Sequence, residues 1–262
     1  ETVTVTSLTG QLTVDDVITT TSGNVELMAT AGALLIDAAV TTTAGTATLT
    51  AGTTITSTAA GTITTTGENA ADQGTAGGAV LLHSTGAGAI TLLGDITASG
   101  GNTTAGTNDG GDAGVITVRN DSGSILIDDV TATGGTSAGG TAGADGTIQL
   151  SATTTIDQQA ATDITAAGGN LKLVSTGGDV TLNNVTNTVA IVAADLTGAS
   201  SLSYTDADGL SIGMIAQAGT GNAQLAAETG IVATGADETV TVTSLTGQLT
   251  VDDVITTTSG NV

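Results

Sequence analysis

The feature that most constrains the fold is a pair of apolar residues, two positions apart, that recurs along the chain. The pairs are Val3/Val5, Val25/Leu27, Ala47/Leu49, Val80/Leu82, Ile116/Val118, Ile148/Leu150 and Leu171/Leu173, at steps of 22, 22, 33, 36, 32 and 23 residues. Apolar residues at every second position are typical of a β-strand with one buried side. A strand that returns about every 22 residues predicts a repeating coil.

Two further apolar positions keep the same phase within each coil. One lies 11 residues after the first, at Val14, Ile36, Ile127 and Leu182, and a third anchor follows at Ile18, Val40, Ile63, Ile96, Val130, Ile164 and Val185. Three short strands per coil of about 22 residues predict an all-β fold, a three-sided parallel β-helix or β-solenoid. A single coil cannot bury its own apolar side and must stack on its neighbours. Parallel crossovers are right-handed by default, so we expect a right-handed helix.

A much longer repeat covers the ends of the sequence. Residues 238–262 repeat residues 1–25 letter for letter, at a distance of 237 residues. We therefore expect residues 1–237 to be one tandem unit, residues 238–262 to begin the next identical unit, and the chain to be a window from a longer repetitive protein. The second copy is expected to occupy the same coil positions as the first. About ten coils per unit would span roughly 50 Å, although the anchors lose their phase within residues 189–237.

Composition excludes several classes of partner. The net charge of -23, with only Arg119 and Lys172 as basic residues, repels nucleic acid and anionic membranes. No run of about 18 apolar residues is present, so no membrane span is expected. The chain has no Cys, Phe or Trp and a single Tyr, Tyr204. The core must therefore consist of Val, Ile, Leu, Ala and Thr, without disulfides or thiolate metal sites.

Three consecutive coils are lengthened at one corner, after the third anchor. The insertions are rich in glycine and cover residues 67–78, 100–114 and 134–146. Stacked coils would bring them together into one outgrowth that can contact a neighbouring filament or a ligand. It carries weak candidates for a Ca²⁺ site: Asp72, Asn108, Asp109, Asp112 and Asp145. The alternative is that insertions gather where loops cost least. The repeated glycine and aspartate pattern of Ca²⁺-binding β-rolls is present only as the fragment Gly110-Gly111-Asp112.

Other polar residues are interpreted structurally. Pairs of Thr on the third strand, such as Thr19/Thr21 and Thr41/Thr43, resemble the flat face of solenoidal antifreeze proteins, but Thr is also a common polar residue in strands. Corner acids such as Asp128/Asp129 recur with the coil, which favours turn formation over a pair of catalytic carboxylates. His83 has no metal-ligand pattern around it. Arg119 and Lys172 are expected to point outward, two coils apart.

Three segments carry a family resemblance. GGNLKLVSTGGDVTLNNVT (168–186), SLSYTDADGLSIG (201–213) and GSILIDDVTATGG (123–135) resemble the repeats of filamentous haemagglutinin-type adhesins and related giant bacterial surface proteins. The resemblance implies a secreted β-helical fibre at the cell surface, in a family often exported by two-partner secretion.

The expected function is the structural shaft of a long extracellular bacterial filament, fibre or sheath, without enzymatic activity or a cofactor other than the weak Ca²⁺ candidates. Its expected partners are further copies of its own unit along the fibre axis. One alternative is an adhesin that binds glycans, a neighbouring filament or another partner surface through the outgrowth. A distant alternative is a polysaccharide-degrading β-helix enzyme, which would want basic and aromatic residues in its cleft.

Overall fold

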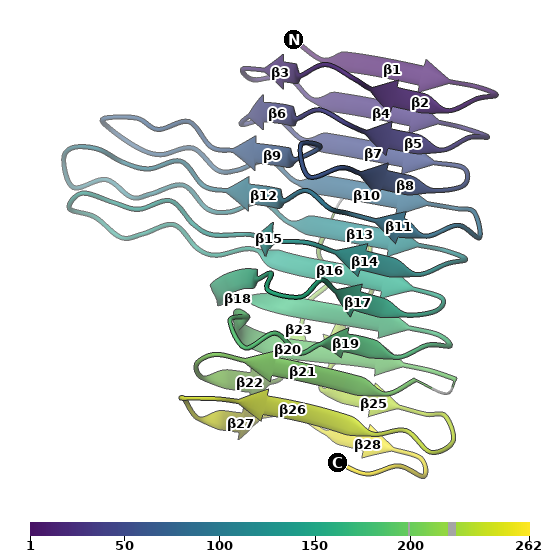
Figure 1. Ribbon diagram of the computed structural model, residues 1–262. Coiled ribbons are helices and arrows are strands. Elements are labelled where there is room, and N and C mark those ends of the chain that lie inside the picture. The colour runs from purple at the N-terminus through teal and green to yellow at the C-terminus, as the bar shows by residue number, and fades with distance from the viewer. Residues whose placement is uncertain (199, 220–223) are drawn as a thin grey trace.

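The chain forms parallel β-sheets that are stacked coil upon coil (Figure 1). The computed structural model describes residues 1–198, 200–219 and 224–262. The elements within these residues are strands, without a helix, as the sequence predicts. Consequently this part of the chain contains no helix long and apolar enough to cross a membrane. Most strands pair in parallel with the strand three positions further along, so three strands complete one coil.

The strands divide into three faces, which we number in chain order. The first face comprises β1 (Val3–Ser7), β4 (Val25–Ala29), β7 (Ala47–Ala51), β10 (Val80–Ser84), β13 (Ile116–Asn120), β16 (Thr147–Ala152), the second halves of β18 (Ile164–Ser175) and β20 (Thr188–Leu196), β25 (Ile231–Ala233) and β28 (Ile255–Thr257). The second face comprises β2 (Leu12–Val14), β5 (Leu34–Ile36), β8 (Ile55–Ser57), β11 (Ile90–Thr91), β14 (Ile125–Ile127), β17 (Ile156–Gln158), β19 (Val180–Leu182), β21 (Leu202–Asp206) and β26 (Val240–Ser244). The third face comprises β3 (Ile18–Thr20), β6 (Val40–Thr43), β9 (Ile63–Thr66), β12 (Ile96–Ser99), β15 (Val130–Thr131), the first halves of β18 and β20, β22 (Leu210–Ile212) and β27 (Leu249–Val251).

The apolar columns predicted from the sequence are present. The register of the first face aligns Val3, Val25, Ala47, Val80, Ile116, Ile148 and Leu171. The register of the third face aligns Ile18, Val40, Ile63, Ile96, Val130 and Ile164. Inward residues from all three faces form one continuous core. Its largest buried side chain is Tyr204, on the second face.

The third anchor predicted at Val185 is wrong. Val185 is 61% exposed, and the third face resumes only at Thr188, which aligns with Thr165. Asn187 takes the inward position and is fully buried. Its Oδ1 accepts a hydrogen bond from Ile164 N at 2.9 Å, and its Nδ2 donates to Leu182 O at 3.1 Å. The hydrogen bonds of a polar side chain thus close this corner. A search of the sequence for apolar anchors cannot find such a residue.

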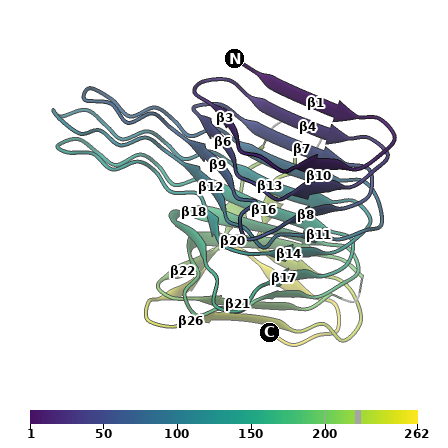
Figure 2. The ribbon, with the colours of Figure 1, turned by 45° about the horizontal axis from the view of Figure 1, so that its top comes forward.

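The corner between the third and first faces varies most from coil to coil. In β18 and β20 it is straightened into one long strand. Residues 67–79, 100–115 and 132–146 leave the coil at this corner, as the insertions predict, and project to one side (Figures 1 and 2). Residues 213–219 and 224–230 leave at the same corner, between β22 and β25, and include the antiparallel strands β23 (Met214–Ile215) and β24 (Glu228–Thr229). We call residues 213–219 and 224–230 the strap. The sequence did not predict it.

The two copies of the 25-residue repeat lie on different faces, which corrects the expectation of identical coil positions. In copy 1, the strands β1, β2 and β3 lie on the first, second and third faces. In copy 2, the same strands are β26, β27 and β28, on the second, third and first faces. Along the first face the chain takes eight steps, from β1 through β4, β7, β10, β13, β16, β18 and β20 to β25. One unit therefore makes eight and one third turns, and not the ten expected.

Candidate functional site

The three projecting loops form one ordered body, which we call the ledge (residues 67–79, 100–115 and 132–146). Neighbouring loops are joined by backbone hydrogen bonds whose donors recur every third residue. Gly67 N donates to Ser99 O at 2.8 Å and Ala70 N to Asn102 O at 3.1 Å. On the returning segments, the donors Gly74 N and Gly77 N bond Asp109 O and Asp112 O. A three-residue period is that of the polyproline II helix, which has no internal hydrogen bonds and must find partners elsewhere.

Glycine is required inside the ledge because the backbones approach closely. A Cβ on Gly101 would lie 2.0 Å from Glu68 O, and one on Gly111 would lie 1.8 Å from Thr75 O. The same glycines donate across the ledge, from Gly101 N to Thr75 O and from Gly111 N to Gly101 O, both at 2.8 Å. Every third residue is Gly at the axis of collagen for the same steric reason. The expectation that stacking brings the three insertions together into one outgrowth is confirmed.

Most of the predicted Ca²⁺ ligands in the ledge hold backbone groups together. Asp109 Oδ1 accepts from Thr141 N at 2.8 Å, and hydrogen bonds with Thr141 lower the pKa of this carboxyl. Asp112 Oδ1 accepts from Ala144 N at 2.8 Å, and Asp145 accepts from two backbone amides through its two oxygens, both at 2.7 Å. Asn108 contributes its backbone carbonyl to Ser137 Oγ. Asp72 lies exposed on the first loop.

A different acidic group has the spacing of metal ligands. Asp95, Asp128 and Asp129, on neighbouring coils, place one oxygen each within 4.8 Å of one another. In the described part of the chain, this group and none of the ledge acids meets that criterion. Burial and the charges of Asp129 and Asp95 raise the pKa of Asp128. Asp129 Oδ1 also accepts from Asp163 N at 2.5 Å, a backbone amide of the neighbouring coil, whereas the turn interpretation predicts a bond within the same turn.

The strap covers the outer side of the first face. Lys172 points away from the core, as expected, but it is fully buried rather than exposed. Its Nζ donates to Ala216 O at 3.0 Å and to Ala226 O at 2.6 Å, one on each side of the strap. Burial lowers the pKa of the Lys172 ammonium, an effect that the Glu228 carboxylate opposes. The ammonium thus holds the strap against the first face and is not exposed to a ligand at the surface.

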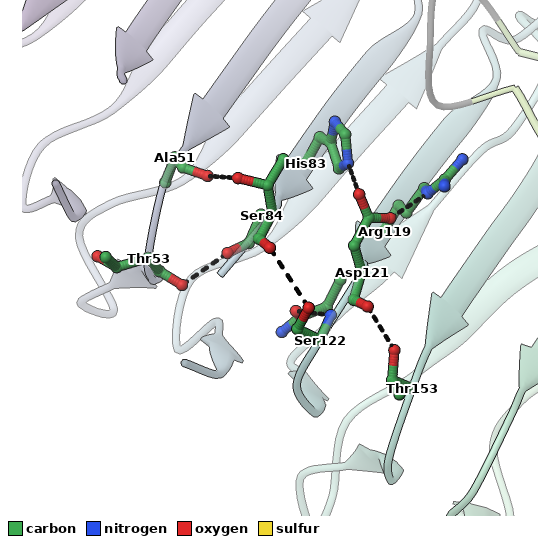
Figure 3. A network of polar contacts seen from close by, with 10 residues as sticks. Ala51, Thr53, His83, Ser84, Arg119, Asp121, Ser122 and Thr153 are labelled. Atoms are coloured by element: carbon green, nitrogen blue, oxygen red, sulfur yellow. Dashed lines mark hydrogen bonds and ion pairs between the residues drawn. The ribbon is translucent and has the colours of Figure 1, made fainter. Parts of the chain in front are cut away.

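Between the strap and the first face lies a groove of about 550 Å³. Arg119 and Asp121 line its wall, opposite Gln224 and Leu225 of the strap. Arg119 Nε donates to Asp121 Oδ1 at 2.6 Å, and His83 Nε2 lies 2.9 Å from Asp121 Oδ2 (Figure 3). Burial favours the neutral Asp121 carboxyl, but the hydrogen bonds from His83 and Arg119 outweigh it and hold its pKa below the usual range.

Two hydroxyls at or near the groove bond backbone carbonyls and not a base. A nucleophilic Ser or Thr needs its hydroxyl within hydrogen-bond reach of a base. Thr153, which lines the groove, instead donates its hydroxyl to Asp121 O at 2.7 Å, and the buried Ser84 of the neighbouring strand donates its hydroxyl to Thr53 O at 2.7 Å (Figure 3). The guanidinium and imidazole are suited to holding a polar ligand. The register places His83, Arg119 and Ser151 in one column.

The third face carries an aligned array of Thr on its outer side. The register places Thr19, Thr41, Thr64, Thr97, Thr131, Thr165 and Thr188 in one row. A second row continues from Thr43 through Thr66 to Ser99, whose Oγ lies 3.2 Å from Thr133 Oγ1. Thr186 does not join this array: it lies in a turn, and its hydroxyl donates to Asp163. The first row ends at Thr188, the residue after Asn187.

No protein-family model, curated protein or solved structure matches the chain. The strap and the groove had no signal in the sequence, because residues 189–237 lack the apolar phase that marks coils elsewhere. The ledge had a clear signal in its glycine content and in its place after the third anchor.

Proposed function

We propose that the chain is a segment of the shaft of a long extracellular bacterial filament, fibre or sheath, built as a right-handed, three-sided β-solenoid. The observation that carries the proposal is the pairing of each coil with the next on all three faces. Copy 1 shows the 25-residue repeat paired with the coil that follows it, and copy 2 shows it paired with the coil that precedes it. The same sequence thus accepts a neighbour on either edge.

The path of the chain supports the solenoid geometry. In Figure 1 the second face lies towards the viewer, the first face lies behind it, and the third face lies on the left. Viewed from the amino terminus, the chain runs clockwise as it recedes, which is a right-handed winding. The basic coil of 22 residues is that of Val3 to Val25 and of Val25 to Ala47.

Charge and burial support a location outside the cell. A net charge of -23 keeps the surface hydrated and opposes collapse onto other acidic surfaces. Trypsin-type proteases cleave after Lys and Arg, of which the chain has one each. Lys172 is buried beneath the strap, and Arg119 is held by Asp121. Cleavage at Lys172 therefore requires the strap to open.

The second candidate function is an adhesin, and the ledge is the observation that favours it. The ledge is ordered through its own backbone bonds and projects away from the coil core (Figure 2). It offers polar side chains to a neighbouring filament or another partner surface. For glycans it lacks an aromatic platform, because the sole aromatic residue, Tyr204, is buried in the core. An enzyme of polysaccharide breakdown is a weaker proposal, since Lys172 is withdrawn from the surface.

A two-unit chain tests the shaft. It is obtained by following Val262 with residues 26–262, because residues 238–262 already repeat residues 1–25. A continuous shaft predicts a single rod of unchanged cross-section, longer than the 262-residue chain by about 40 Å at roughly 4.8 Å per coil. Small-angle scattering and electron microscopy measure both quantities. Two bodies joined at variable angles would contradict the proposal.

A further inference from the structure

Copy 2 leaves an apolar surface at the end of the coil stack. A cavity of about 340 Å³ opens there, lined by Val240, Val242, Leu249, Val251 and Ile255 among others. The corresponding residues of copy 1 are Val3, Val5, Leu12, Val14 and Ile18. Val14 is 5% exposed, whereas Val251, the same residue of the repeat, is 55% exposed. The local sequence is identical, so the difference comes from what lies next to each copy.

Copy 1 shows which segment covers this surface. The following coil, residues 26–47, lies against it: Leu12 aligns with Leu34, Val14 with Ile36, and Ile18 with Val40. The backbone bonds run the same way, with Leu12 N donating to Ala33 O and Ile18 N to Ala39 O, at 2.9 and 3.0 Å. Copy 2 uses its opposite edge, since Gln248 O and Val254 O accept from the preceding coil. Its other edge therefore matches the edge that residues 26–47 cover in copy 1.

We infer that the surface formed by Val240–Ile255 is the docking site for residues 26–47 of a further copy of the unit, and that each copy enters the fold rotated by one face. The inference rests on the proposed shaft and deepens it. Copy 2 begins on the second face where copy 1 begins on the first. Every element of a following unit is consequently displaced by one face around the axis.

The rotation sets the direction in which each ledge projects. In this unit the ledge leaves between the third and first faces. In the next it leaves between the first and second faces, and in the one after between the second and third. Ledges thus form three rows around the shaft, each step about 120° in azimuth and about 40 Å along the axis, and a fourth unit repeats the first. A filament with three such rows can contact neighbours in three directions.

Electron cryo-microscopy of the two-unit chain tests the rotation. The 262-residue chain is the control, because its map gives the gradual twist of the sheets within one unit. The inference predicts one rod whose two ledges differ by about 120° after that twist is subtracted. One rod with both ledges on the same side would overturn the rotation and leave the shaft intact. Two independent bodies would overturn the shaft and the inference together.

A smaller extension tests the docking site without the longer chain. Residues 26–47 are added once after Val262, and a scrambled sequence of the same composition is added in the control. Hydrogen exchange is measured in β26, β27 and β28. The inference predicts that the added coil slows exchange there at least about tenfold, towards the rates of β1, β2 and β3. Exchange equal to that of the scrambled control would overturn it.

Discussion

At the scale of single residues, Asn187 replaces an apolar anchor with four hydrogen bonds. It joins Ile164 N, Leu182 O and both polar atoms of the Gln158 amide. Ile164 N and Leu182 O would lose these bonds if the amide were removed, at a cost of about 1–3 kcal/mol per buried group left unsatisfied, whereas Gln158 Nε2 would keep its bond to Thr162 O. The corner therefore depends on Asn187, whereas the apolar pattern of the sequence predicts Val185 as its anchor.

A pair of substitutions separates these two positions. We expect Asn187→Val to lower the free energy of unfolding by about 2–4 kcal/mol, since it orphans Ile164 N and Leu182 O. Val185→Asn, at an exposed site two residues away, is the matched control and should change it by less than about 0.5 kcal/mol. Chemical denaturation measures both. A larger loss of unfolding free energy from Val185→Asn than from Asn187→Val would show that Val185 is the anchor, as the sequence predicted.

Asp206 makes the stability of the carboxyl-terminal coils depend on pH. Burial raises its pKa to about 6, against hydrogen bonds from Tyr204 and Val189 that favour the charged form. Tyr204 OH donates to its Oδ2 at 2.8 Å. Because the folded state binds this proton more tightly than the unfolded state, ionisation of Asp206 destabilises the fold above pH 6. That cost is relieved as the pH falls from about 6 towards 3.8, the ordinary pKa of an aspartate carboxyl.

We therefore expect the chain to gain stability from Asp206 between pH 7 and pH 5, on the order of 1–2 kcal/mol. Asp206→Asn mimics the protonated acid and should remove this gain, while the contributions of the other acids remain. The measurement is the difference in unfolding free energy between wild type and Asp206→Asn at several pH values. A difference that stays constant from pH 7 to pH 5 would show that Asp206 does not titrate there.

At the scale of elements, the middle loop of the ledge holds the other two. The first loop bonds to the middle one through Ala70 N, Gly74 N and Gly77 N, and the third loop lies on the opposite side of the middle one. The shaft does not rely on the ledge, because short coils close the same corner with three residues, Ala44 to Thr46, between β6 and β7. Order in the first loop should thus follow the presence of the middle loop.

Two replacements test this dependence. Ala-Gly-Thr, the sequence of residues 44–46, replaces residues 100–115 in one variant and residues 134–147 in its matched control, so that both corners keep the spacing of Val40 to Ala47. We expect the first variant to speed hydrogen exchange in residues 67–79 at least about tenfold, and the control to leave it unchanged. The strands of the three faces should stay protected in both. Loss of strand protection would show that the ledge is part of the core.

The elements differ in how far they could be predicted from the sequence. The columns of Val3 and Ile18 were predictable because every coil needs an inward apolar residue at the same place. The polyproline-like order of the ledge was not, since it depends on contacts between backbones, such as Gly111 with Thr75, and not on side chains. The strap was missed because Lys172 holds it by two carbonyls, which leave no pattern in the sequence.

At the scale of the whole molecule, the fractional turn decides how repeats are arranged. The sequence shows the two copies but not their faces, because the coils between residues 189 and 237 could not be counted without the strap and the long strand β20. With those elements placed, one unit advances eight turns and one face. Identical sequence then occupies different faces of the same stack, and each of the three strands pairs in parallel with a preceding strand on its new face.

The most direct test of the account is a set of cysteine pairs in the 262-residue chain, which has no cysteine of its own. Ser203 and Thr241 are aligned neighbours on the second face, so Ser203→Cys with Thr241→Cys should form a disulfide. Val232, on the first face, aligns with Thr256. Val232→Cys with Thr241→Cys should therefore remain reduced under the same conditions. The reverse outcome, a disulfide only in the second pair, would place copy 2 on the face of copy 1 and contradict the one-third turn.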